Sequence, residues 1–233
     1  MRPFYALAAA ALLGSAGSQA AAPPRKAAAP AARDWSRTVV ATPEGGFRVG
    51  NPAAPVKLVE YGSLTCNHCA AFAREGVPPL MAGPVKSGRV SYEFRNFVLN
   101  GIDVTATLLA RCAGPDRFFA LSDTLYRTQE QWVARIAGLP QAQKDRLEAL
   151  PDSQRLGRVA ELGGLLAVAA RFGVTPARGK QCLADKAALD RLGKINEAGM
   201  ALGVKGTPTF LINGQLAPAG NWATLEPLLK TAG

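Results

Sequence analysis

Residues 56–75 read VKLVEYGSLTCNHCAAFARE, and this stretch decides the fold. Residues 56–62 are mostly β-branched or apolar, which predicts a buried strand. Residues 70–75 are rich in alanine, which favours a helix. A short polar turn joins the two segments and ends at Cys66. The sequence therefore predicts that Cys66 lies at the N-terminus of a helix that follows a strand directly.

Cys66 and Cys69 form a CxxC motif at this predicted helix start. Unpaired backbone N–H groups and the positive end of the helix dipole stabilise an anion at such a position. The pKa of the first thiol in a CxxC motif is lowered for this reason. Each pKa unit favours the reduced dithiol by about 1.4 kcal/mol. The motif therefore predicts a redox-active disulfide that is passed on to other proteins.

A CxxC motif is also half of a zinc ribbon, so the other possible ligands of the chain distinguish the two interpretations. A tetrahedral zinc site needs two more ligands, usually a second closely spaced pair. Cys112 and Cys182 belong to no CxxC or CxxH motif, and His68 is the single histidine of the chain. The spacing argues against a metal site. We expect no metal, and no cofactor other than the Cys66–Cys69 disulfide itself.

The composition is that of a globular protein with a basic surface. The chain has 233 residues, of which 48% are hydrophobic and 19% charged, and its formal net charge is +10. This is ample material for a hydrophobic core. The positive charge could indicate a nucleic-acid partner, but no zinc finger, RNP-like motif or basic stripe with interleaved aromatic residues accompanies it. We therefore expect a solvated basic surface and no nucleic-acid partner.

The N-terminal segment predicts export. Arg2 precedes an apolar run at residues 4–13, and residues 18–20 (Ser-Gln-Ala) offer a small-residue cleavage site. This is the pattern of a cleaved signal peptide, here residues 1–20, although an uncleaved anchor is the alternative. The Ala/Pro-rich residues 21–37 are expected to form a tether. An exported chain with four cysteines fits a disulfide-permissive compartment such as the periplasm.

Strand and helix signals follow in a definite order. Asn213-Gly214 is a strong signal for a two-residue hairpin. Apolar residues recur every three or four positions between residues 103 and 202, which predicts a block of helices. Asp103 or Thr105 is expected to cap the first of them. Strands are expected at residues 38–41, 56–62, 90–97, 209–212 and 215–217, turns at 43–46 and 50–55, and a last helix from residue 221.

This order, with the CxxC motif after the second predicted strand and Gly206-Thr207-Pro208-Thr209-Phe210 before the hairpin, resembles the DsbA-like thiol:disulfide oxidoreductases. The resemblance covers residues 38–231. It implies an α/β protein with a thioredoxin-like fold and an inserted all-helical domain. Residues 38–102 and 203–233 would form the thioredoxin-like domain, and residues 103–202 the insertion.

The resemblance and the residues together assign catalytic roles. Cys66, nearer the helix N-terminus, is predicted to be the nucleophile that enters a mixed disulfide, and Cys69 to resolve it. His68 stands where the family also has histidine and can stabilise the Cys66 thiolate; an exposed spacer imidazole is the alternative. Glu60 matches the buried acid beneath the family's active site and would accept a proton from Cys69. Its alternative is an exposed charge on the strand.

Pro208 resembles the cis-proline that faces the CxxC motif in thioredoxin-fold proteins, and the alternative is an ordinary trans proline. Because proline has no N–H, the adjoining backbone is free to pair with an extended substrate. We assign substrate binding to Asn67, Thr207 and Pro208. Two of these depart from the best-known oxidant of the family, since Asn67 replaces its proline and Thr207 resembles the residue of disulfide isomerases. The direction of the reaction therefore stays open.

Cys112 and Cys182 both fall in the helical block. Once the CxxC motif pairs locally, a bridge between these two is the single remaining connectivity. The oxidising compartment favours this structural disulfide. The alternative is a pair of buried thiols that act as small hydrophobic side chains.

The favoured function is that of an oxidoreductase that introduces disulfides into reduced exported proteins. A membrane-bound, DsbB-like partner would reoxidise it, and the chain is expected to act as a monomer. The near alternative is a disulfide isomerase or reductase that uses the same residues. A non-catalytic chaperone-like or surface protein with a structural CxxC is a third hypothesis, and a peroxidase finds no support in the sequence.

Overall fold

The strand β3 (Val56–Gly62) is the centre of a six-stranded mixed sheet within the described chain, with the order β1-β2-β4-β3-β5-β6. It pairs in parallel with β4 (Val90–Asn96) and antiparallel with β5 (Thr209–Ile212). The residues of β3 are buried or half-buried along its whole length, on both faces of the sheet, which explains its near-continuous apolar sequence. The remaining strands are β1 (Val39–Ala41), β2 (Phe47–Gly50) and β6 (Gln215–Leu216).

This computed structural model describes Met1 and residues 33–233. The predicted signal peptide beyond Met1 and the larger part of the predicted tether lie outside the described residues. Residues 33–233 belong to one compact unit. The division of the chain into a thioredoxin-like domain and an insertion therefore stays a prediction.

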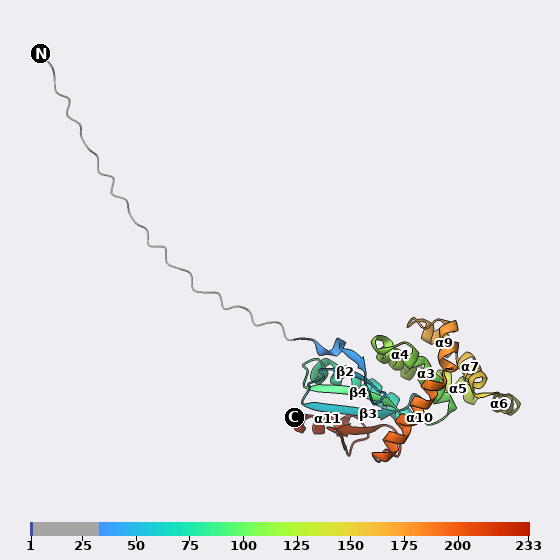
Figure 1. Cartoon of the computed structure of the whole chain (residues 1–233). Coiled ribbons are helices and arrows are strands. Elements are labelled where there is room, and N and C mark those ends of the chain that lie inside the picture. Colours follow the sequence, from blue (N-terminus) through green and yellow to red (C-terminus); the bar gives the residue numbers. More distant parts are fainter. Residues whose placement is uncertain (2–32) are drawn as a thin grey trace. The chain divides into compact units, whose positions relative to one another are not determined.

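Helices cover the sheet and continue beside it (Figure 1). The helix α1 (Asn67–Glu75) follows β3 and leads into α2 (Val77–Leu80) and a short π-helix (Met81–Val85). The middle of the chain is helical throughout, as the sequence predicted. Its helices are α3 (Gly101–Cys112), α4 (Pro115–Arg127), α5 (Gln129–Ala137), α6 (Gln141–Glu148), α7 (Asp152–Gly163), α8 (Leu165–Ala170), α9 (Pro176–Leu183) and α10 (Lys186–Ala201). A 3-10 turn (Trp35–Arg37) precedes β1, and α11 (Trp222–Thr231) ends the fold.

Local signals set several of these boundaries. In the β5–β6 hairpin, Asn213 and Gly214 both have positive φ values, 50° and 84°, as the two-residue turn between twisted strands requires. The Asn221 side chain accepts from the backbone of Thr224 in a capping box that begins α11. Both features agree with the sequence prediction.

Two local predictions were wrong. The strand β2 was not expected, because residues 47–50 are few and run directly into the turn signals at residues 50–55. The first helix of the block is capped by Asn100, and neither Asp103 nor Thr105 serves as its cap. Asp103 lies within the first turn of α3 and is fully buried, where it bonds to another part of the chain.

One apolar core joins the sheet to the helices. The buried face of α1 places Phe72 against Phe210 of β5, with ring centroids 4.7 Å apart. The ring of Phe47 on β2 stacks on Phe118 of α4 at 4.2 Å. A Cβ atom at Gly199 of α10 would lie 2.9 Å from the ring of Tyr61, so glycine permits the close approach of α10 to β3. These contacts hold the sheet and the helical block together.

We predict that Phe72→Ala lowers the free energy of unfolding by about 3–5 kcal/mol, because it empties a site buried between α1 and β5. Urea unfolding measures the change. The matched control is Met200→Ala, whose side chain is exposed on α10 and which is expected to change the free energy by less than about 0.5 kcal/mol. Equal losses in both variants would contradict the packing described here.

We also predict that replacing both Cys112 and Cys182 by alanine lowers the free energy of unfolding by about 2–4 kcal/mol. The two residues are disulfide-bonded between α3 and α9 and are 70 residues apart in sequence, so the bridge restricts the unfolded chain. Guanidinium unfolding of the variant and of the parent protein tests this. A loss below about 0.5 kcal/mol would show that the bridge constrains nothing.

Candidate active site

Cys66 occupies the N-cap position of α1 and is half-buried, with extended backbone angles (φ −84°, ψ 123°). A hydrogen bond with the Cys69 side chain is the largest effect on its thiol, and it lowers the pKa of Cys66 to about 5. The Thr207 side chain and the backbone N–H groups of Cys69 and His68 act in the same direction, while partial burial opposes them. Cys66 is therefore a thiolate at neutral pH, as its place at a helix N-terminus predicted.

Cys69 has the opposite character. Its side chain is fully buried, and this burial raises the pKa of the Cys69 thiol well above its ordinary value. The hydrogen bond with Cys66 and the charges of Glu60 and Cys66 raise the pKa further. Both cysteines are free thiols in this structure. The reduced pair thus consists of an accessible thiolate and a buried neutral thiol.

Glu60 lies on β3 and is 1% exposed. Burial raises the pKa of its carboxyl group to about 8; a hydrogen bond from the Tyr92 hydroxyl opposes this rise, and the Cys66 charge adds to it. The alternative of an exposed charge on the strand is therefore wrong. Tyr92, which the sequence analysis did not identify, extends from the adjacent strand β4.

The Thr207–Pro208 peptide bond is cis, and the loop that contains it faces the CxxC motif. The Cys66 sulfur lies 3.2 Å from the carbonyl oxygen of Thr207, to which its thiol donates when it is protonated. The Thr207 hydroxyl is buried and makes no hydrogen bond of ordinary geometry within residues 33–233. Antiparallel pairing of β5 with β3 brings this loop to the cysteine, 141 residues earlier in the chain.

The two residues between the cysteines are exposed. The Asn67 side chain accepts from the backbone N–H of His68 at 2.9 Å. Within residues 33–233, no recorded hydrogen bond involves the His68 imidazole. His68 acts on the Cys66 thiolate through its backbone N–H, and a role for its side chain stays a prediction.

The turn at residues 63–66 is held by side chains from the helical block. The Tyr126 hydroxyl donates to the carbonyl of Ser63 at 3.1 Å. Asp103 accepts from the N–H of Leu64 at 2.9 Å, and burial raises the pKa of its carboxyl group to about 6. The Gln129 amide donates to two further carbonyls of the same turn. The sequence carries no local signal for these contacts, because the partners are 39 to 65 residues apart.

Residues 33–233 contain no group of three or more His, Cys, Asp and Glu side chains placed to hold a metal ion. The bridged Cys112 and Cys182 lie apart from the CxxC motif on α3 and α9, so they do not supply further thiolates to it. Among the described helices, none combines the length and apolar character needed to cross a bilayer.

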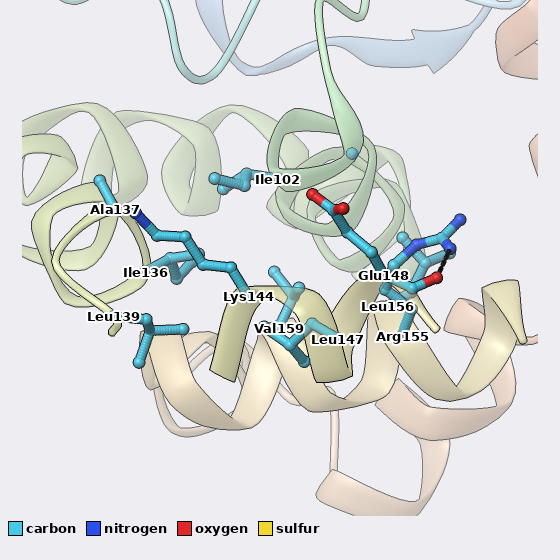
Figure 2. Close-up of a pocket in the computed structure, with 11 residues that line it drawn as sticks. Ile102, Ile136, Ala137, Leu139, Lys144, Leu147, Glu148, Arg155, Leu156 and Val159 are labelled. Atoms are coloured by element: carbon cyan, nitrogen blue, oxygen red, sulfur yellow. Dashed lines mark hydrogen bonds between the residues drawn. The ribbon is translucent and has the colours of Figure 1, made fainter. Parts of the chain in front are cut away.

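One of the hollows in the described chain lies beside the site, and another lies within the helical block. One, of about 240 Å³, lies beside α1 and is polar; Asn67, Arg74 and Gln129 are among its lining residues. The other, of about 250 Å³, is largely apolar and lies among α3, α5, α6 and α7 (Figure 2). Lys144, Glu148 and Arg155 are its charged residues, and no cysteine lines it.

The chain is similar to known proteins both in sequence and in structure. A family model described as Thioredoxin matches residues 42–231. A protein-disulfide isomerase structure from Novosphingobium aromaticivorans is 34% identical, with a TM-score of 0.74 over 78% of this chain and 94% of that chain. Wolbachia pipientis α-DsbA1 shares the fold at 21% identity, with a TM-score of 0.64 over 80% of this chain and 90% of that one. A Rickettsia bellii protein provisionally named protein-disulfide oxidoreductase is 30% identical over 73% of this chain, which spans only 58% of that protein's length.

We predict that the thiolate absorbance of the reduced protein titrates with a midpoint near pH 5. In Cys69→Ala the midpoint rises, because the hydrogen bond that lowers the pKa of Cys66 most is lost. The folded pKa lies below the unfolded value of about 9, so the thiolate stabilises the reduced fold fully above pH 9. This contribution is lost as the pH falls through about 5. An unchanged midpoint in Cys69→Ala would contradict the assignment.

Proposed function

This chain belongs to the thioredoxin family, and from that premise we propose that it is a thiol:disulfide oxidoreductase that introduces disulfide bonds into exported proteins. The observation that carries the proposal is the contrast between the two thiols of the CxxC motif. The pKa of Cys66 is lowered to about 5, whereas the pKa of Cys69 is raised. A stabilised thiolate favours the reduced pair, and a pair that prefers to be reduced gives its disulfide away.

The proposed reaction begins with the pair oxidised. A substrate thiolate attacks Sγ of Cys66, the Cys66–Cys69 bond breaks, and Cys69 leaves as a thiolate. Because the pKa of Cys69 lies above that of Glu60, about 8, the Glu60 carboxyl group can give this thiolate a proton. The role that the resemblance implies for Glu60, acceptor of a proton from Cys69, is the same transfer in the reverse direction.

The second step releases the product. A second substrate thiolate attacks the substrate sulfur of the mixed disulfide, and Cys66 leaves as a thiolate. A thiol of low pKa is a good leaving group, so the low pKa of Cys66 favours this step. The substrate has then lost two electrons and gained one disulfide, and the protein holds a Cys66 thiolate and a Cys69 thiol. Asn67, Thr207 and Pro208 border Cys66 and would contact the extended substrate.

The same residues could act as an isomerase or reductase. Thr207 before the cis-proline resembles the residue of disulfide isomerases, and Asn67 departs from the family's oxidant. The 34% identical relative is named a protein-disulfide isomerase. The low pKa of Cys66 favours the oxidant instead, because it stabilises the reduced protein.

The cellular setting belongs to the proposal as well. The signal-like residues 1–20 and the Cys112–Cys182 bridge support an oxidising compartment, and we place the protein in the periplasm. Reduced exported proteins would be its substrates. Each turnover leaves the CxxC pair reduced, so a membrane-bound, DsbB-like redox partner would restore the disulfide. We expect the protein to act as a monomer.

We predict that the Cys66–Cys69 pair has a reduction potential more positive than about −180 mV, the value of protein disulfide isomerase. Equilibration of the purified protein with glutathione buffers measures it, with and without the Cys112–Cys182 bridge. A value at or below −180 mV would overturn the proposed direction and favour the isomerase or reductase. Each tenfold change in the equilibrium corresponds to about 30 mV.

A matched pair of variants tests whether the motif is catalytic at all. Cys66→Ser is expected to abolish oxidation of a reduced, unfolded test protein, because it removes the attacked sulfur. The Cys112→Ala/Cys182→Ala double variant keeps the CxxC pair and is expected to retain the activity at a temperature where it is folded. Full activity in Cys66→Ser would favour a non-catalytic protein with a structural CxxC.

A further inference from the structure

A single side chain from the helical block binds two backbone carbonyl groups in the turn that leads into the CxxC motif. Gln129, the first residue of α5, donates through Nε2 to the carbonyl oxygen of Leu64 at 2.8 Å and to that of Cys66 at 3.0 Å. Its side chain lies in the protein interior, with 7% of the residue exposed. The amide thus uses both of its N–H groups on the turn that ends in the reactive cysteine.

The chemistry of the partners fixes the orientation of this amide. Both partners are carbonyl oxygens, which only accept hydrogen bonds, so the nitrogen of Gln129 must face them. Loss of the amide would leave two carbonyl groups with fewer partners in a buried place, which is costly. The arrangement is therefore specific to an amide of this length, and neither a carboxylate nor an apolar side chain can replace its function.

The Cys66 carbonyl is the point where this contact meets the reactive site. It also accepts from the N–H of Ala70 at 3.1 Å, the first hydrogen bond of α1. The backbone of Cys66 is thus fixed from two directions. Its sulfur, in contrast, interacts with the Cys69 side chain, whose own bonding changes during the reaction.

We propose that Gln129 is a positioning residue for the exchange reaction: it fixes the Cys66 backbone so that the sulfur stays against the N–H groups of the first turn of α1. This inference rests on the proposed function. Each exchange step makes or breaks a bond at Sγ of Cys66 and pulls on that residue. Because Gln129 keeps the Cys66 backbone in position, the Cys66 thiolate re-forms at the same position against these N–H groups after each exchange step.

A test of this proposal must leave the other titratable residues around Cys66 unchanged. Cys69 and Glu60 act on it from α1 and β3, and Asp103 binds the same turn from α3. Arg74 of α1 and Glu130 of α5 line the polar hollow beside Asn67. The variants below leave all of these residues in place.

The test compares Gln129→Met with Gln129→Asn. Methionine removes both donors and keeps the length and the apolar packing, whereas asparagine keeps a neutral amide that is one methylene too short to reach both carbonyls. The control is Gln131→Met, which makes the same chemical change on the exposed side of α5. The measurements are the pKa of Cys66 by thiolate absorbance, the glutathione equilibrium of the pair, and urea unfolding.

We expect the pKa of Cys66 to rise by about one unit in both Gln129 variants, because its thiolate loses part of its hydrogen bonding. The equilibrium with glutathione should shift about tenfold toward the oxidised pair, or about 30 mV. Gln131→Met should match the parent in both respects. If Gln129→Met does not fold, the neutral asparagine variant decides the question.

A loss of unfolding free energy without a change in the pKa or the equilibrium would overturn the proposal, since it would show a purely structural role. Failure of the proposed function would be seen separately in the parent protein. It would appear as an ordinary pKa for Cys66, or as a pair that does not exchange with glutathione, in the protein with Gln129 intact.

Discussion

The stabilisation of the negative charge on the Cys66 sulfur is the interaction on which the other parts of the site depend. A thiolate needs hydrogen-bond donors, and the first turn of α1 supplies them from the N–H groups of His68 and Cys69. The central strand β3 brings the cysteine to this turn, and β5 brings the Thr207–Pro208 loop within 3.2 Å of the sulfur. The sheet and the helix therefore matter to the chemistry because they place neutral dipoles around one charge.

Burial divides the titratable groups of the site into two kinds. Cys66 is accessible and ionised, whereas Cys69 and Glu60 are buried and hold their protons more tightly. The hydroxyl of Tyr92 keeps the Glu60 carboxyl group paired in the interior. An unpaired carboxylate there would be costly. Under the proposed function, the buried Glu60 carboxyl group holds the proton that the Cys69 thiolate takes up.

The sequence was informative wherever a structural feature is encoded by neighbouring residues. The strand at residues 56–62, the helix start at Cys66 and the Asn213-Gly214 hairpin were all predictable from local patterns. The contacts of Tyr92, Asp103 and Gln129 were not, because each joins residues that are far apart in the chain. Asp103 illustrates the difference, since its position near a helix start suggested a cap while its carboxylate in fact binds Leu64 and Leu99.

The Cys112–Cys182 bridge has a consequence for how the protein itself matures. The structure holds one closed disulfide, Cys112–Cys182, and one pair of free cysteines, Cys66 and Cys69. Under the proposed function, a newly exported copy must be oxidised once at Cys112 and Cys182 before its helical block is complete. Mature copies of the protein can supply that oxidation, so the protein would be one of its own substrates.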